Sequence, residues 1–304
     1  MVSVVIATYN GARFLRQQLQ SIIDQTYPNI EIIVVDDASR DDTISIVTEY
    51  AITDHRVRLH PSERNIGFLK NFERGVLLSS GDYIALSDQD DIWLPEKIEI
   101  LMRERKDHPL IYCNSELIDE NGKSLGIKLT DLKNLKNFAS PINYTVGGTA
   151  SGHAMIVKRE VVVESLPWPP MVTHDFWIGF VSTFTGPMKF VDQVLVLYRQ
   201  HENNVIGVTG GGAKATPQKR KTKEERDELK RQRIRLMYKK CPAHLSEAKQ
   251  FFYTLVKSYE DFSLRKNFMR MAAFLKHRHK ITAYKKRNEL RRILFCLKMF
   301  VKIE

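Results

Sequence analysis

Residues Tyr83–Asp91 read YIALSDQDD, an apolar run followed directly by a turn that holds three aspartates. The apolar run is bounded by Gly81 and predicts a short buried strand. Pro95 and Glu96 are residue types typical of the first turn of a helix. Three carboxylates so close together repel one another, so they indicate a bound cation, and oxygen ligands suit Mg²⁺ or Mn²⁺. A solvated acidic loop, with Asp91 capping the next helix, is the alternative interpretation.

Upstream of this turn, strand patterns alternate with helical patterns. The strand-like runs are Val2–Thr8, Ile30–Val35 and Val57–Leu59, and helical spacing follows each of them. Asn10 is expected to cap the first helix. The alternation predicts an α/β fold with a mostly parallel sheet flanked by helices and right-handed crossovers. Carboxylates at the carboxyl ends of such strands lie where open α/β sheets bind their ligands.

Downstream of the turn, the same sheet is predicted to continue. Residues 126–150 are polar and irregular, and a connection of this length is more often functional or mobile than not. The remaining expected elements are a helix over 95–106, a strand over 110–113, a hairpin turn at Asn121-Gly122, a strand over 154–157, a helix over 175–184 and closing strands over 190–191 and 194–198.

Charge divides the chain into unequal parts. Residues 1–204 carry 20 Lys and Arg against 27 Asp and Glu, whereas residues 205–304 carry 27 against 9. Residues 1–204 are predicted to form the α/β domain. Residues 205–225, with Gly210-Gly211-Gly212 and a basic run, are predicted to be a flexible linker. Residues 226–304 are predicted to form an all-helical, basic and amphipathic extension.

The basic extension implies an anionic partner. Its terminal helices combine an apolar stripe with the basic segments Lys276–Lys280, Lys285–Arg287 and Arg291-Arg292, which is typical of helices that lie on a membrane surface. Packing of the stripe against the first domain, or against a second copy in a homodimer, is an equal alternative. Membrane binding and packing can also occur in the same protein. Nucleic acid is not expected as a partner, because no recognition fold accompanies the charge. The stripe consists of Leu290, Ile293, Leu294, Leu297, Phe300 and Val301.

The sequence predicts a cytoplasmic protein. A strand pattern begins at Val2 without the basic and then apolar segment of a secretion signal, and no stretch is apolar over the thickness of a bilayer. Cys113, Cys241 and Cys296 are odd in number and far apart, so they predict neither a disulfide framework nor a CxxC metal site.

The nucleotide motifs of two common α/β folds are absent. The first strand-to-helix turn, Tyr9-Asn10-Gly11, lacks the glycine pair of a Rossmann site, and there is no GxxxxGK[ST] loop. Asp36 and Asp37 end the second strand, where a carboxylate can accept a hydrogen bond from a base N–H or a ribose hydroxyl. Capping of the helix that begins near Asp41 is the alternative. A bound nucleotide would therefore be held in another way.

An ordered set of motifs over about residues 2–204 resembles the family 2 glycosyltransferases with the GT-A fold. A single Asp-x-Asp is weak evidence, whereas five matching segments in order are strong evidence. The segments are VVIATYN (Val4–Asn10), QTYPNIE (Gln25–Glu31), VVDDAS (Val34–Ser39), NIG with KN (Asn65–Asn71) and SDQDDIW (Ser87–Trp93).

The resemblance implies how a nucleotide sugar is held. Ala7, Thr8 and Tyr9 would contact the nucleoside together with Asp37, which would lie at the pyrimidine ring. Lys70 stands where many members carry a basic residue near the diphosphate.

The resemblance also implies a metal site. Asp88 and Asp90 match the Asp-x-Asp motif of the family; Asp88 would contact both nucleotide and metal, and Asp90 would bind Mn²⁺ or Mg²⁺ directly. His201 would reach the metal or the diphosphate, with a simple loop histidine as the alternative.

Asp175 matches the position that usually supplies the general base. The preceding residue is usually acidic in the family, whereas here it is His174. Arg199 and His174 are candidates for the diphosphate or the acceptor. His153 and Trp177 are candidates for contacting the acceptor sugar, and each is as compatible with core packing.

The chemistry suits these residue types. A metal and a basic side chain would stabilise the leaving diphosphate, and a carboxylate would take the proton of the incoming hydroxyl. One base without a second carboxylate nucleophile predicts a single displacement with inversion. The segment Tyr198–His201 replaces the Gln-x-x-Arg-Trp box of processive synthases, which favours transfer of a single sugar.

Three segments resemble those of bacterial rhamnosyltransferases: Ser87–Trp93, Ser151–His153 and His174–Trp177. This resemblance implies dTDP-L-rhamnose as donor and a glycan or lipid-linked glycan of a surface polysaccharide as acceptor. A UDP-hexose donor is the alternative. A lipid-linked acceptor would suit an enzyme at the inner face of the cell membrane. Two other functions are alternatives. A nucleotidyltransferase would usually show a Gly-rich, basic first loop, which is absent here. An inactive membrane-bound adaptor with the same fold would not need Asp88, Asp90 and Asp175, so their presence argues against it.

Overall fold

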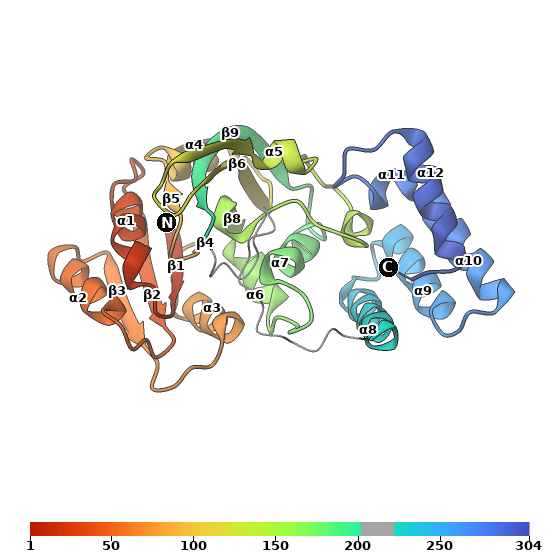
Figure 1. The fold of residues 1–304 in the computed structure, drawn as a ribbon, viewed down its shortest axis with the longest axis horizontal. Helices are drawn as coiled ribbons and strands as arrows, with labels where there is room; N and C mark the ends of the chain where they lie inside the picture. Colours follow the sequence, from red (N-terminus) through yellow and green to blue (C-terminus); the bar gives the residue numbers. More distant parts are fainter. Residues whose placement is uncertain (202–221, 304) are drawn as a thin grey trace.

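The computed structural model describes residues 1–201 and 222–303. Most of the linker predicted over 205–225 therefore lies outside the described residues, although helix α8 already begins at Lys223. Figure 1 shows the sheet with its flanking helices at one end of the molecule and helices α8–α12 at the other. The strands are β1 Val2–Thr8, β2 Ile30–Asp36, β3 Val57–Pro61, β4 Tyr83–Ser87, β5 Ile92–Trp93, β6 Leu110–Ile118, β7 Ser124–Lys128, β8 Met155–Lys158 and β9 Lys189–Arg199. The helices are α1 Ala12–Ile23, α2 Thr43–Thr53, α3 Phe68–Leu78, α4 Lys97–Glu104, α5 Leu129–Leu132, α6 Arg159–Ser165, α7 His174–Ser182, α8 Lys223–Lys240, α9 Ser246–Ser258, α10 Leu264–Lys276, α11 Arg278–Ile281 and α12 Glu289–Leu297, with short 3₁₀ turns η1 Pro141–Tyr144, η2 Gly152–Ala154 and η3 Lys298–Phe300.

The first half of the sheet is parallel, as the alternating pattern predicts. Its strand order is β3-β2-β1-β4. Strand β1 is covered on both faces, because Val4 and Ile6 pack in the core beneath α1, and Val5 packs in the core beneath α3. This burial explains the nearly unbroken run of β-branched residues. The carboxyl ends of β1, β2 and β4 therefore meet at one edge of the sheet.

The second half of the sheet is mixed. Strand β8 lies between β4 and β6 and is antiparallel to both, β9 is parallel to β6, and β5 is antiparallel to β9. The sequence order alone did not reveal that β8 separates β4 from β6. The β6–β7 hairpin turns at Asn121-Gly122, where Gly122 has a φ of 86° as such a turn requires.

Two local expectations need correction. Asn10 does not cap α1: Gly11 occupies that position, and the Asn10 carboxamide instead accepts a hydrogen bond from the backbone of Arg40. Residues 126–150 are not simply an irregular connection, because they include α5 and η1 and bury Phe138 and Tyr144. Aromatic burial rather than polarity dominates this segment.

The helical extension shares a core with the α/β domain. The rings of Phe180 in α7 and Phe252 in α9 lie 5.8 Å apart, and both are fully buried. The Asn143 side chain donates to the Lys280 carbonyl oxygen at 3.0 Å. One apolar cluster runs from the sheet through α7 into α8, α9 and α10. The extension thus packs on the α/β domain, one of the arrangements that the sequence allows. Among the described residues, no helix combines the length and apolar character needed to cross a bilayer.

Candidate functional site

The aspartate turn lies at the carboxyl end of β4 and is fixed to the neighbouring strand β1. Its middle residue, Gln89, accepts a hydrogen bond from the Tyr9 amide at 2.9 Å and donates to the Tyr9 carbonyl oxygen at 3.2 Å. A Cβ atom at Gly11 would come within 2.2 Å of the Gln89 side chain. Glycine at position 11 therefore lets Gln89 hold the turn against the end of β1. The sequence analysis gave Gln89 no role.

Asp90 and His201 form the outer face of the turn. The His201 Nε2 atom lies 2.8 Å from an Asp90 carboxylate oxygen, although the two residues are 111 positions apart. The His201 ring also packs against Phe14 of α1 at 4.9 Å. A carboxylate and an imidazole converging in this way offer two ligands that suit a divalent cation. The sequence predicted both residues as metal ligands, and the structure brings them together.

Asp88 connects the turn to the start of α7. Burial raises the pKa of Asp88 to about 7, with further increases from the charges of Asp90 and Asp175 and a smaller opposing effect from Lys97. The Asp175 carboxylate is therefore close enough to act on Asp88. Two predicted metal or nucleotide ligands and the predicted base gather at one place.

A second group of polar side chains lies on the buried face of the turn. Asp91 is fully buried, and one of its carboxylate oxygens accepts from the Arg199 amide at 3.0 Å. The other oxygen has no hydrogen-bond partner among the described residues, and His153 Nδ1 lies 3.7 Å from it. Asp88, Asp91 and His153 have ligand atoms within 4.8 Å of one another, so they form a second possible cation group within the described chain. Asp91 does not cap a helix, in contrast to the alternative interpretation of the turn.

Lys97 adds a buried amine to this group. Its side chain is fully buried, and its Nζ donates to the His153 carbonyl oxygen at 2.6 Å. Burial lowers the pKa of Lys97 to about 7 against the opposing charges of Asp91 and Asp88. Burial also lowers the pKa of His153 to about 3, so its imidazole is neutral. Lys97 was not among the residues predicted for the site. Its place on the apolar side of the helix after Trp93 could have indicated that it is buried.

His153 itself is part of the interior. It is buried, it contacts Ser115 Oγ at 3.0 Å through Nε2, and its ring packs on Tyr198 at 4.4 Å. His153 thus lies in the interior next to Asp91, and it is only 4% exposed.

The predicted nucleoside residues lie at the ends of β1 and β2. Thr8 donates to Asp36 at 2.8 Å, and Tyr9 is 45% exposed beside them. The Asp37 carboxylate accepts from the amides of Ile66 and Gly67 at 2.7 and 2.9 Å. Asp37 therefore shapes the loop that leads into α3. Ala7, the last predicted nucleoside residue, is partly buried on the same edge of the sheet.

Lys70 lies on α3 and forms an ion pair with Glu73 at 2.6 Å. Glu73 also accepts a hydrogen bond from the Trp168 amide at 2.6 Å, so the pair ties α3 to the segment before α7. The Lys70 side chain is half exposed. A diphosphate would have to compete with Glu73 for it.

Arg199 has a different position from the one expected of a diphosphate ligand. It is 1% exposed, and its guanidinium donates to Gln17 Oε1 at 2.6 Å, to the Asp90 carbonyl oxygen at 2.8 Å and to the Glu120 carbonyl oxygen at 2.9 Å. The side chain therefore joins α1, the aspartate turn and the β6–β7 hairpin. We correct its expected role to a positioning one, because its donors are already engaged inside the protein.

The start of α7 carries the remaining predicted residues. Asp175 is partly exposed, and its carboxylate accepts from the Phe176 amide at 2.7 Å. The His174 ring stacks on Trp168 at 5.4 Å, and burial lowers the pKa of His174. Trp177 is buried and donates from its indole N–H to the Ser165 carbonyl oxygen at 3.0 Å. Trp177 thus belongs to the core, the alternative that the sequence left open.

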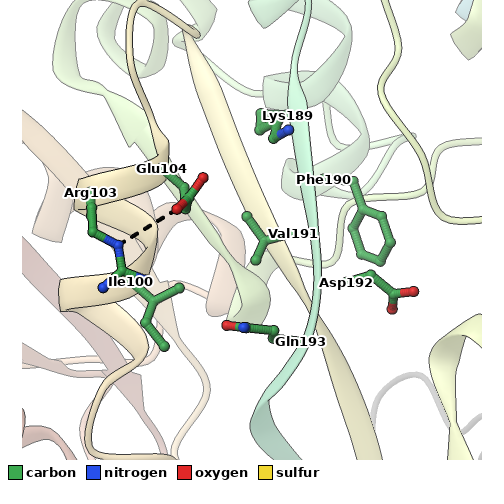
Figure 2. Close-up of a pocket in the computed structure, with 8 residues that line it drawn as sticks. All are labelled: Ile100, Arg103, Glu104, Lys189, Phe190, Val191, Asp192 and Gln193. Atoms are coloured by element: carbon green, nitrogen blue, oxygen red, sulfur yellow. Dashed lines mark ion pairs between the residues drawn. The ribbon is translucent and has the colours of Figure 1, made fainter.

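A surface cavity of about 320 Å³ lies elsewhere, between α4 and β9. Figure 2 shows it lined by oppositely charged side chains, with an ion pair of 3.5 Å between Arg103 and Glu104. None of the predicted site residues lines it. We therefore place the functional site at the aspartate turn.

Comparisons with known proteins identify the family of this chain. Residues 3–165 match the profile of Glycosyl transferase family 2. The dTDP-rhamnosyl transferase RfbG of Shigella flexneri is 30% identical over 219 residues, which cover 66% of this chain and 73% of that protein. The structure of S. aureus TarS (residues 1–349) in complex with UDP-GlcNAc is 17% identical with a TM-score of 0.58, over 92% of this chain and 81% of that chain.

The mannosyltransferase PcManGT of Pyrobaculum calidifontis, in complex with GDP-Man and Mn²⁺, is 17% identical with a TM-score of 0.50, over 91% of this chain and 74% of that chain. Both solved structures show a shared fold at these identities. The match to the family profile covers more than half of the chain. This chain belongs to glycosyl transferase family 2, and it is a glycosyltransferase with the GT-A fold.

Proposed function

We propose that the protein is an inverting, metal-dependent glycosyltransferase that moves a single sugar from a nucleotide diphosphate to a hydroxyl group. The observation that supports this most is the contact of His201 with Asp90 at the carboxyl end of β4, next to Asp88, whose pKa is raised by burial and also by the charges of Asp90 and Asp175. Such an arrangement places cation ligands beside a candidate base, as the reaction requires.

The outer pair, Asp90 and His201, is the part of the turn that fits a divalent metal, with Asp88 beside it. The ligand types are hard or borderline and suit Mn²⁺ or Mg²⁺. The inner group, Asp88 with Asp91 and His153, fits a metal less well, because the Lys97 amine is already buried beside it and one Asp91 oxygen already accepts from the Arg199 amide. A bound metal would stabilise the negative charge that develops on the leaving diphosphate.

Asp175 would act as the general base. Its carboxylate would accept the proton of the acceptor hydroxyl while that oxygen bonds to the anomeric carbon and the bond to the diphosphate breaks. Among the other carboxylates of the described site, Asp88 and Asp90 are assigned to the metal and Asp91 is fully buried, which leaves none of them as a covalent nucleophile. A single displacement, and hence inversion, follows.

The best candidate for the donor is dTDP-L-rhamnose, since a 30% identical relative is named a dTDP-rhamnosyl transferase. A UDP-hexose is the second candidate, because the similar TarS structure holds UDP-GlcNAc. Ala7, Thr8, Tyr9 and Asp37 would contact the nucleoside. The proposed acceptor is a glycan or lipid-linked glycan of a bacterial surface polysaccharide, and the proposed location is the cytoplasmic face of the cell membrane.

A donor panel tests this proposal. Thermal unfolding and donor hydrolysis are measured with dTDP-L-rhamnose, UDP-hexoses and GDP-mannose, each with Mn²⁺, with Mg²⁺ and with chelator. We expect a metal-dependent increase in melting temperature and metal-dependent hydrolysis for dTDP-L-rhamnose. A response to a UDP-hexose alone would show that the donor is a UDP-hexose and not dTDP-L-rhamnose. No response to any donor would favour an inactive adaptor with the same fold.

A further inference from the structure

Helix α12 has two apolar faces, and only one of them packs on the protein. On the inner face, Cys296 and the following Met299 are buried. On the outer face, Leu290, Leu294, Leu297 and Val301 are 64%, 49%, 43% and 61% exposed. Leu290, Leu294 and Leu297 recur at helical spacing in α12, and Val301 lies just beyond η3, so the exposed stripe extends past the end of the helix. Of the six residues of the apolar stripe expected from the sequence, four are exposed, and Ile293 and Phe300 are partly buried.

Helix α10 extends this exposed surface. Leu264 is 70% exposed and Phe268 is 56% exposed. The Phe268 ring contacts the Phe300 ring at 4.9 Å, which joins the side of α10 to the end of α12. We call the six exposed residues Leu264, Phe268, Leu290, Leu294, Leu297 and Val301 the outer apolar face. Figure 1 shows α10 and α12 at the end of the molecule remote from α2 and β3.

The surroundings of the outer apolar face are basic. Arg291, Lys298 and Lys302 are exposed along the same stretch as the stripe, and Arg265 is exposed on α10. Two of the three acidic residues nearby in sequence are paired, Glu289 with Arg278 at 2.5 Å and Glu260 with Lys257 and Lys266. The third, Asp261, is exposed and accepts a hydrogen bond from the Ser263 amide, so it offsets one of the four positive charges. The described rim of the face therefore presents net positive charge.

We propose that the outer apolar face docks on an anionic lipid leaflet. Apolar side chains would enter the boundary between headgroups and acyl chains while the surrounding lysines and arginines contact anionic headgroups. A second copy of this chain fits less well. A two-fold contact would set the same basic rim against itself, and like charges at an interface are unfavourable. Membrane docking is inferred from the surface alone. It rests on the proposed function only for its biological purpose, which would be to hold the enzyme beside a lipid-linked acceptor.

Vesicle binding of the full chain tests the proposal. The probe is flotation with vesicles of phosphatidylcholine alone or with about one third phosphatidylglycerol. The test variant carries Leu290→Ser, Leu294→Ser, Leu297→Ser and Val301→Ser. The matched control carries serine at four exposed apolar positions elsewhere, Ile52, Leu77, Leu132 and Val163, which are 80%, 65%, 49% and 43% exposed. A further variant, Arg291→Glu with Lys298→Glu, removes charge without removing apolar surface.

We expect the original chain and the matched control to bind the anionic vesicles, and the test variant to lose at least about tenfold in apparent affinity at an unchanged melting temperature. The charge variant should lose binding in a salt-dependent manner. Donor hydrolysis, which needs no membrane, should be the same in all four proteins. Absence of binding by the original chain, or equal binding by the test variant, would overturn the proposal. So would a dimer in sedimentation that becomes a monomer in the test variant without any vesicle binding. Because donor hydrolysis is read separately, loss of the transferase proposal would be visible on its own.

Discussion

At the scale of single residues, the site brings like charges together and partly removes them from water. Asp88 shows the consequence most clearly, since burial and the charges of Asp90 and Asp175 raise its pKa to about 7. A carboxyl group of this kind prefers to hold its proton until a cation arrives. Metal binding and proton release are therefore expected to be coupled at this turn.

This coupling predicts a pH dependence of the metal-free protein. The folded state holds the Asp88 proton more tightly than the unfolded state, whose pKa is near 4. The resulting stabilisation is complete below about pH 4 and is lost as pH rises through about 7. We expect the melting temperature of the original protein, relative to Asp88→Asn, to fall between pH 4 and 8. Mn²⁺ should restore the difference at pH 8. A constant difference across this range would contradict the assigned environment of Asp88.

Asp175 carries a second prediction at this scale. Asp175→Asn keeps the shape of the side chain but removes its ability to accept a proton. We expect kcat to fall by about 10²–10⁴, the usual contribution of a general base, with donor affinity unchanged. Glu160→Gln, an exposed carboxylate in α6, serves as the control. Turnover of Asp175→Asn equal to that of the control would remove Asp175 from the mechanism.

At the scale of elements, the site depends on how closely α3 and the turn approach the sheet. A Cβ atom at Gly75 of α3 would lie 2.4 Å from Val5 Cγ1 and 3.1 Å from Val35 Cγ2. Glycine here lets the helix rest on β1 and β2. The α3 helix in turn carries the Lys70–Glu73 pair and follows the loop held by Asp37.

This contact predicts that replacing Gly75 by alanine lowers the stability of the protein, the opposite of the usual effect inside a helix. Replacing glycine by alanine inside a helix normally stabilises it by about 1 kcal/mol. We expect Gly75→Ala to destabilise the protein by about 1–3 kcal/mol, because the added methyl overpacks the core. Gly186→Ala is the control, since its Cβ would make only ordinary contacts, the nearest at 3.4 Å from Pro109. Urea unfolding of both variants measures the difference; a stabilised Gly75→Ala would refute the packing argument.

The predictability of the elements follows from how local their signals are. The strands β1 to β4 were predicted correctly, since unbroken β-branched runs between turn residues leave little alternative. The position of β8 between β4 and β6 was not predictable from the sequence. It is set by pairing with two strands that are distant in sequence, and local patterns do not indicate such pairing. Arg199 was misjudged for a similar reason: its partners Gln17, Asp90 and Glu120 are distant in sequence, and only the folded chain shows that its donors are engaged.

The candidate site was recovered unevenly. Asp88 and Asp90 were identified through an ordered motif, and His201 and Asp175 by their positions in the family resemblance; the structure brings Asp90 and His201 into contact. Lys97 was missed although its place on the apolar side of α4, with Ile98 and Leu101, distinguishes it from a surface lysine. Similarly, the stripe on α12 gave the apolar positions but not which of them face outward, since that depends on the packing of α10 and η3 against it.

At the scale of the whole molecule, the helical extension and the α/β domain share apolar contacts and are expected to unfold together. Phe252 of α9 is fully buried against Phe180 of α7, whose first turn supplies Asp175. The extension therefore supports the helix that carries the proposed base.

A pair of neighbouring substitutions tests this dependence. Phe252→Ala should destabilise the chain by about 3–5 kcal/mol, because it leaves a cavity in the shared core. Tyr253→Ala, at a position 41% exposed, should cost less than about 1 kcal/mol. Unfolding followed by fluorescence and by protection of α7 against proteolysis should shift together in Phe252→Ala. Unfolding of the extension alone, with α7 still protected, would show that the two parts are independent.

The position of the metal is the most direct test of how this chain works. Anomalous diffraction at the manganese edge is measured from crystals soaked with Mn²⁺ and dTDP. We predict one manganese peak in contact with both Asp90 and His201, beside the diphosphate of the nucleotide. A peak between Asp91 and His153 instead, or dTDP bound at the turn with no manganese at all, would contradict the proposed metal-dependent mechanism.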